Sequence, residues 1–138
     1  MANAATETLR RDGFTVKTRP ADYLGHDRAR IALFLHFDGS PHPCDGGASV
    51  GFPPGTNHSF VQAWEHRYGA IFPYRFVGEN ISSNEAHYYA YRRVTTPGQT
   101  MLIEFGEMTC EKQERWMQPR LHELGVAVAR FVRAELRP

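Results

Sequence analysis

The sequence predicts a single α/β domain, residues 1–138, in which helices cover both faces of a mostly parallel central sheet. Segments typical of strands alternate with segments typical of helices along the chain. Residues 31–37 and 100–105 are short apolar runs, as expected of strands buried between two layers. Each run ends near a polar residue, His36 and Glu104, and a glycine follows soon after. We expect these two most apolar strands at the centre of the sheet, with a ligand site beyond their carboxyl ends.

The first half of the chain carries the clearest strand signals. The expected elements are a helix at 2–11, strands at 13–19, 31–37 and 48–52, and a loop at 38–47. The first strand is predicted because Phe14 and Val16 share one face. The loop is predicted from its Gly, Pro and Asp content.

The second half is mostly helical. Ser59 is the expected N-cap of one helix, and Gln62, three residues later, completes a capping box. Ser82 and Glu85 have the same spacing and predict a second capped helix. Thr109 can cap the last helix, in which Pro119 marks a break. Apolar residues recur on one face of each helix: Phe60, Val61, Trp64 and Tyr68 in one, and Met117, Leu121, Leu124, Val128, Phe131 and Val132 in the other. Trp64 and Trp116 are expected to serve the core.

Composition and charge argue against a nucleic-acid-binding protein, a membrane protein and a disulfide-rich scaffold. The net charge is +1, so we expect no nucleic-acid partner and no anionic membrane surface. No apolar run approaches the roughly 18–20 residues of a membrane span. The first residues lack the apolar stretch of a signal peptide, which predicts cytoplasmic synthesis. Two cysteines, Cys44 and Cys110, are too few for a disulfide scaffold, and whether they form a single bridge stays open.

The two strand ends could support hydrolytic chemistry. An imidazole such as His36 can bind a metal through either ring nitrogen. A carboxylate on a neighbouring strand, Glu104, can take a proton from a water and pass it to a leaving group. Both residue types also serve structural roles, a hydrogen-bonded strand histidine or an ion-paired glutamate. Asp38 lies two residues beyond His36, so we expect both on one face of the strand.

Several segments resemble the zinc-dependent N-acetylmuramoyl-L-alanine amidases of the amidase-3 type, which cut peptidoglycan. The segment LRRDGFTVKTR is similar to that family's helix end, glycine and strand, and LFLHFDGS to its strand with a zinc-binding histidine. GGASVGFP resembles the glycine-rich lead into its next strand. TMLIEFGEMTCEKQERWM resembles the late segment that carries its catalytic glutamate. The likeness extends from about Leu9 to Leu136.

The resemblance implies roles for individual residues. His36 matches a zinc ligand, Glu104 the catalytic carboxylate, and Asp38 a residue that shapes the loop or contacts substrate. Residues 78–91 resemble a loop and helix over the substrate side in some phage-type members, where Asn84 could bind a muropeptide. Tyr88, Tyr89 and Tyr91, with Arg92 and Arg93, could line a substrate groove.

The sequence departs from this family at its beginning. The early histidine and glutamate that complete the family's zinc site have no match here, and catalytic zinc normally takes three protein ligands. Three explanations stay open: a chain that lacks the family's first strand, a metal-free relative, or substitute ligands. The substitutes considered are His26, His42, His58, His87 and Glu7.

The expected function is therefore hydrolysis of the amide between N-acetylmuramic acid and L-alanine, by a zinc-bound water with Glu104 as base and His36 as ligand. The partner would be peptidoglycan, and the chain would act at the cell wall as a phage lysin or a wall-remodelling enzyme. The alternative is an inactive wall-binding or interaction module with this fold. A zinc carboxypeptidase-like hydrolase is a third possibility, because that fold is related.

Overall fold

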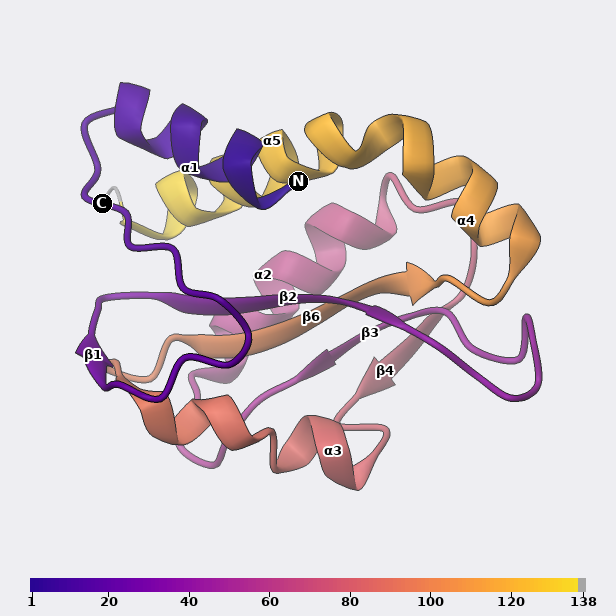
Figure 1. The fold of residues 1–138 in the computed structure, drawn as a ribbon, viewed down its shortest axis with the longest axis horizontal. Coiled ribbons are helices and arrows are strands. Elements are labelled where there is room, and N and C mark those ends of the chain that lie inside the picture. The colour runs from indigo at the N-terminus through magenta and orange to yellow at the C-terminus, as the bar shows by residue number, and fades with distance from the viewer. Residues whose placement is uncertain (137–138) are drawn as a thin grey trace.

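The computed structural model describes residues 1–136, and a four-stranded sheet lies at its centre (Figure 1). Its strands follow the order β2 (Ala32–Asp38), β6 (Thr100–Glu107), β3 (Ala48–Gly51) and β4 (Phe76–Glu79). The pairs β2–β6 and β3–β4 are parallel, whereas β3–β6 is antiparallel. A separate parallel pair joins β1 (Asp27–Arg28) to β5 (Val94–Thr95). The predicted α/β class with a mostly parallel sheet is confirmed.

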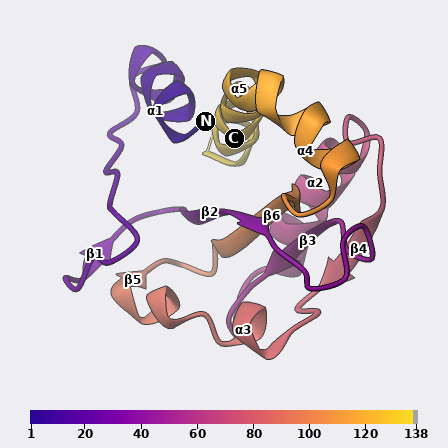
Figure 2. The ribbon, with the colours of Figure 1, turned by 45° about the vertical axis from the view of Figure 1, so that its right-hand side comes forward.

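Helices cover both faces of the sheet, as predicted (Figure 2). One side carries α1 (Ala2–Arg11), α2 (His58–Gly69), α4 (Glu111–Met117) and α5 (Leu121–Leu136). The other side carries the short helix α3 (Ser83–Ala86) and the 3-10 helix η1 (Tyr89–Arg93). A second 3-10 turn, η2 (Gln118–Arg120), contains Pro119 and separates α4 from α5, so the predicted break is confirmed. None of the helices within residues 1–136 is long and apolar enough to cross a membrane.

The main core lies between the sheet and the larger helix layer. Trp64, Phe105 and Phe131 are fully buried there, with the ring centroids of Trp64 and Phe131 5.4 Å apart. Tyr68 stacks on Trp64 and donates a hydrogen bond to the Phe105 carbonyl at 2.6 Å. The predicted core role of Trp64 is thus confirmed. The prediction for Trp116 is only partly right, because this side chain is half-buried at the edge of the core.

Helices α1 and α5 pack closely because α5 has a glycine at the contact. A Cβ added at Gly125 would lie 2.3 Å from the Met1 carbonyl oxygen and 2.9 Å from the Ala4 Cβ. Because Gly125 has no side chain, the backbones of α1 and α5 can approach closely at this point. The glycine is needed here for space and not for an unusual backbone conformation.

The predicted central position of residues 31–37 is wrong, since β2 is an edge strand of the four-stranded sheet. Every residue of β2 is only partly buried. Its apolar character has another cause: Leu33, Leu35 and Phe37 pack against the main core, while Phe34 contacts Tyr88 and Tyr91 on the opposite face. The apolar residues on both faces of β2 therefore show that other elements pack against both faces, not that the strand is central. Of the two strands predicted to be central, only β6 has neighbours on both sides.

The predicted strand at residues 13–19 is also wrong, because the structure has no strand between α1 and β1. Phe14 and Val16 do pack against the core, which explains their alternation. Lys17 and Arg19 instead bind the Asp27 carboxylate, at 2.9 and 2.8 Å, and hold the pKa of Asp27 well below its usual range. The segment is held by side chains rather than by a ladder of backbone hydrogen bonds.

The predicted caps are correct at one helix and wrong at two. Ser82 caps α3, accepting a hydrogen bond from the Glu85 backbone N–H at 3.1 Å. Asn57, not Ser59, caps α2, because the helix begins earlier than expected. Cys110 occupies the N-cap of α4, and the Thr109 hydroxyl donates to Glu107 instead. Short polar residues lie near the N-terminus of each of these three helices. Their pattern therefore predicted where the helices lie but not which residue begins each one.

The capping of α2 gives a stability prediction. The Asn57 side chain accepts a hydrogen bond from the Ser59 N–H at 3.1 Å, so Asn57→Ala should lower the free energy of unfolding by about 1 kcal/mol. Urea unfolding measures this change. Ser59→Ala is the matched control and should cost less, because the Ser59 hydroxyl donates to the Asn57 side chain and satisfies no backbone N–H of the helix among residues 1–136. A larger loss in the Ser59 variant would contradict the assignment of the cap.

Candidate functional site

A row of polar side chains crosses three strands of the sheet. His36 on β2 lies directly beside Glu104 on β6, and Glu104 lies directly beside Ser49 on β3. Residues at matching positions on paired strands present their side chains to the same face. This row faces α3 and η1, since His36 contacts Tyr88 and Ser49 contacts Glu85. The structure thus brings His36 and Glu104 together, as the positions of the strand ends predict.

The His36 ring is held between a carboxylate and a phenol. Its Nδ1 lies 3.9 Å from Glu104 Oε1, and its Nε2 lies 3.0 Å from the Tyr88 hydroxyl oxygen. The rings of His36 and Tyr88 meet edge to face, with centroids 4.9 Å apart. Burial lowers the pKa of His36 below its ordinary value, which favours the neutral imidazole, in which one ring nitrogen keeps its lone pair.

Glu104 is a buried carboxyl group with an unused oxygen. The residue is 9% exposed, and no described residue forms a hydrogen bond with its buried Oε2. Burial raises the pKa of Glu104 to about 8, and the negative charges of Asp38 and Glu85 contribute to the rise. A carboxyl group that titrates near neutral pH can both hold and release a proton, which is the property of a general acid–base.

Glu85 closes the other end of the row. Its Oε1 accepts a hydrogen bond from the Ser49 hydroxyl at 2.6 Å, and its Oε2 accepts one from the Ile81 N–H at 2.7 Å. Burial raises the pKa of this carboxyl group, although these hydrogen bonds oppose the rise. Gly51 lets α3 approach the sheet, because a Cβ there would lie 2.7 Å from the Glu85 carbonyl oxygen. The packing of α3 therefore places a second carboxyl group near Glu104.

Asp38 and Asn84 occupy different positions around this row. A register shift between His36 and Asp38 pairs Asp38 with Glu107 on β6. Asp38 Oδ1 accepts a hydrogen bond from the Gly39 N–H at 2.7 Å, which shapes the start of the loop after β2. Asn84 is exposed on α3, next to Glu85. The substrate-contacting roles of both residues stay predictions.

The loop that follows β2 is tied to the end of β6. Cys44 and Cys110 form a disulfide, which answers the question that two isolated cysteines leave open. Glu107 accepts hydrogen bonds from the backbone N–H groups of Cys44 and Gly46, both at 2.9 Å, and from the Thr109 hydroxyl at 2.7 Å. Burial opposes ionisation of Glu107, but these donors prevail and its pKa lies below the ordinary value. The loop beside Asp38 is therefore held by one covalent and several polar links.

Sequence reasoning misses Ser49, Glu85 and Glu107 as parts of this region. Ser49 is one residue of a short strand, and only its register against β6 places it beside Glu104. Glu85 reads as part of a capping box, whereas its side chain turns inward to Ser49. For Glu107, the one available signal is a second carboxylate three residues after Glu104 at the end of the same strand.

The described residues do not form a metal site. Among residues 1–136, no three His, Cys, Asp or Glu side chains gather closely enough to hold a metal ion. The substitutes considered above do not fill the gap: His58 binds Glu79 at 2.9 Å, and His26 lies 3.3 Å from the Thr95 hydroxyl. His36 and the unpartnered oxygen of Glu104 suit a cation or a polar ligand, but together they fall short of the three ligands of a catalytic zinc.

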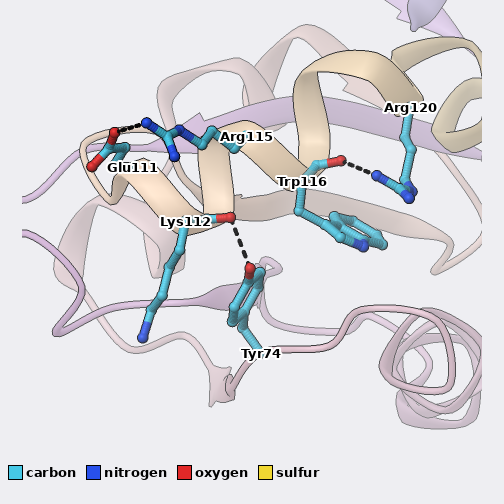
Figure 3. Close-up of a pocket in the computed structure, with 6 residues that line it drawn as sticks. All are labelled: Tyr74, Glu111, Lys112, Arg115, Trp116 and Arg120. Atoms are coloured by element: carbon cyan, nitrogen blue, oxygen red, sulfur yellow. Dashed lines mark hydrogen bonds and ion pairs between the residues drawn. The ribbon is translucent and has the colours of Figure 1, made fainter.

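A surface hollow of about 410 Å³ lies on the helix side of the molecule and is separate from this row (Figure 3). Arg120 lies over the Trp116 ring at 5.1 Å and donates a hydrogen bond to the Trp116 carbonyl at 2.9 Å. The Tyr74 hydroxyl donates to the Lys112 carbonyl at 2.8 Å, and Arg115 pairs with Glu111. No residue of the His36–Glu104 row lines this hollow.

No protein-family model matches the sequence, and no curated protein is significantly similar to it. Solved structures are similar in fold. AmiC2, an N-acetylmuramoyl-L-alanine amidase of Nostoc punctiforme, is 17% identical over 99% of this chain and 80% of its own, with a TM-score of 0.75. Cwp6 from Clostridium difficile is 18% identical over 99% of this chain and 24% of its own, also with a TM-score of 0.75.

The catalytic domain of CwlV, an N-acetylmuramoyl-L-alanine amidase from Bacillus (Paenibacillus) polymyxa var. colistinus, is 14% identical, with a TM-score of 0.62. The match covers 78% of this chain and 58% of the CwlV domain, so this chain spans little more than half of that domain's length. The element order, the mixed sheet and the layered helices therefore give this chain the fold of N-acetylmuramoyl-L-alanine amidases, as the sequence resemblance implies.

Proposed function

We propose that this chain hydrolyses peptidoglycan at the amide between N-acetylmuramic acid and L-alanine. The observation that carries the proposal is the pairing of His36 and Glu104 on adjacent parallel strands, with Glu104 Oε2 buried and without a hydrogen-bond partner among the described residues. The likeness in fold to N-acetylmuramoyl-L-alanine amidases supports the same substrate class. The site of action would be the cell wall, where this polymer lies.

Glu104 is the proposed general base. It would take a proton from the attacking water as the new bond to the carbonyl carbon forms, and return a proton to the nitrogen of L-alanine as the C–N bond breaks. The raised pKa, about 8, suits both transfers, because the ionised carboxylate is a stronger base than an ordinary Glu and both protonation states are populated near that pH. Asp38 and Asn84, at the loop after β2 and on α3, are the proposed contacts to the muropeptide.

Zinc is the proposed cofactor, with His36 as one ligand. Since the described residues supply too few further ligands, the remaining ones would have to come from another segment or molecule. Once those ligands are supplied, the expected result is bound zinc, held with lower affinity in His36→Ala, as measured by metal analysis after dialysis. Zinc content that is unchanged in the His36 variant would exclude this residue as a ligand.

The proposed reaction is tested on purified peptidoglycan sacculi. The products should carry new free amino groups on L-alanine, and they should carry neither new reducing sugar ends nor single released C-terminal residues. Glu104→Gln should lower the initial rate about 100-fold or more, the usual contribution of a general acid–base. Glu111→Gln, the same chemical change on an exposed residue of α4, is the matched control and should leave the rate unchanged.

Three results would count against this function. Release of single C-terminal residues would indicate a carboxypeptidase, and new reducing ends would indicate glycan cleavage. A chain that sediments with sacculi but releases nothing, with Glu104 intact, would indicate the wall-binding module instead.

A further inference from the structure

A second hollow, of about 520 Å³, lies next to the one in Figure 3, and the side chains of Trp116 and Arg120 line both. The rest of its lining comes from Ile71, which follows α2, and from residues of α5. No residue of the His36–Glu104 row lines it. The proposed hydrolytic site therefore gives this hollow no role.

The hollow has an apolar part on a face of α5 that does not pack on the core. Positions 123, 126, 127 and 130 line it at the three- and four-residue spacing of one helix face, whereas the buried residues Val128 and Phe131 lie on another face. The outward face of a surface helix is usually polar. Here it carries Val126 and Ala127, both half-buried, and Ile71 in the same hollow is 50% exposed. The lining therefore offers apolar side chains that are partly open to solvent.

Two arginines of the lining have no carboxylate partner. Arg120 lies over the Trp116 ring at 5.1 Å and donates to the Trp116 carbonyl at 2.9 Å, and these two contacts fix its guanidinium (Figure 3). Arg130 is exposed, and neither arginine forms an ion pair with any of residues 1–136. Glu123 is the acidic residue of the lining. Two arginines against one glutamate leave an excess of positive charge, which complements an acidic ligand.

The spacing of the two arginines suits an extended peptide. Arg120 and Arg130 are ten positions apart along the helix, which at 1.5 Å per residue is about 15 Å. An extended chain advances about 3.3 Å per residue, so two carboxylates four or five residues apart span this length. A guanidinium can donate two parallel hydrogen bonds to each carboxylate.

We propose that this hollow binds an acidic peptide segment of a partner protein in extended conformation. Two carboxylates of the segment meet Arg120 and Arg130, and an apolar side chain between them packs on Ile71 and Ala127. A peptide supplies the charges and the apolar group at the spacing of the lining, which a small anion does not. The interaction is independent of the proposed hydrolysis, because no residue of the His36–Glu104 row takes part in it.

Tryptophan fluorescence can follow this binding. Trp116 lines the hollow, whereas Trp64, the other tryptophan, is 1% exposed in the core. The probe is a peptide blocked at both ends, with glutamate at its first and fifth positions and leucine at its third. It should change the fluorescence of the wild type in a saturable manner, and added salt should weaken the binding. The same peptide with glutamine in place of both glutamates is the ligand control and should not bind.

Single substitutions should move the affinity in opposite directions. Arg120→Gln should weaken binding about tenfold, since a fixed guanidinium is lost, and Arg130→Gln by a smaller factor, since that side chain is exposed. Glu123→Gln should strengthen binding about twofold, because it removes a like charge from the lining. Arg11→Gln, the same change at an exposed position of α1, is the matched control and should leave the affinity unchanged.

Three results would overturn the proposal. The first is equal affinity for the glutamate and glutamine peptides, and the second is unchanged or weaker binding in Glu123→Gln. The third is a dimer of the chain in solution that Ile71→Asp abolishes, which would assign this hollow to a second copy instead. Loss of hydrolysis on sacculi would count against the proposed function alone, because the peptide titration requires no catalysis.

Discussion

Glu104→Gln is expected to stabilise the protein by about 1–3 kcal/mol at pH 9 while it removes the proposed base. Burial, with the charges of Asp38 and Glu85, raises the pKa of Glu104 from an ordinary 4.5 to about 8. Each pKa unit corresponds to about 1.4 kcal/mol, so ionising Glu104 in the folded state costs at most about 5 kcal/mol. Water entering the site reduces this cost. Glutamine keeps the shape of the side chain and never ionises.

The pH dependence of this gain has a definite sign. Below pH 4.5 the carboxyl group is protonated in both the folded and the unfolded chain, so its ionisation changes nothing. As the pH rises from 4.5 through about 8, the unfolded chain releases the proton first, and the wild type loses stability relative to the variant. Urea unfolding at pH 5 and pH 9, in the presence of a chelator, measures the difference. Equal stability differences at the two pH values would show that Glu104 does not titrate as inferred.

Loss of the disulfide is the second large effect expected. Cys44 and Cys110 are 66 residues apart, and Cys110 is fully buried. A cross-link of this span mainly restricts the unfolded chain, so Cys44→Ala combined with Cys110→Ala should lower the free energy of unfolding by about 2–4 kcal/mol. Removing both sulfurs avoids leaving a buried thiol without its partner.

The control for this effect is the wild type itself, unfolded in the presence of a reductant. Its stability should fall to about that of the double variant, while the reductant leaves the variant unchanged. A double variant as stable as the oxidised wild type would mean that the bridge adds no stability.

The position of the His36–Glu104 pair could be predicted because it depends on strand ends. Two apolar runs that each close on a polar residue need only lie side by side and parallel to bring those residues together, and β2 and β6 do so. The order of the other strands could not be predicted in the same way. Ser49 reaches Glu104 through an antiparallel contact between β3 and β6, which no pattern within residues 48–52 encodes.

Local sequence patterns gave wrong predictions where a segment is held by side-chain contacts and not by backbone pairing. The alternation of Phe14 and Val16 is real, but it reflects contact with the core rather than a strand. The polar residues around 57–59 mark the start of α2, yet Asn57 rather than Ser59 is its cap, and the Asn57 N–H is bound by a distant residue, donating to the Gly98 carbonyl at 2.7 Å. Such choices are made by tertiary contacts, which a single sequence does not display.

The covalent link between Cys44 and Cys110 also bears on where the chain can mature. Thiols remain reduced in most cytosols, and disulfides persist in oxidising surroundings such as the periplasm or the cell exterior. A chain kept in the cytosol would have its 39–47 loop held by Glu107 and its polar neighbours alone. In an oxidising compartment the Cys44–Cys110 link would be added to these polar contacts, so the loop would be anchored covalently as well.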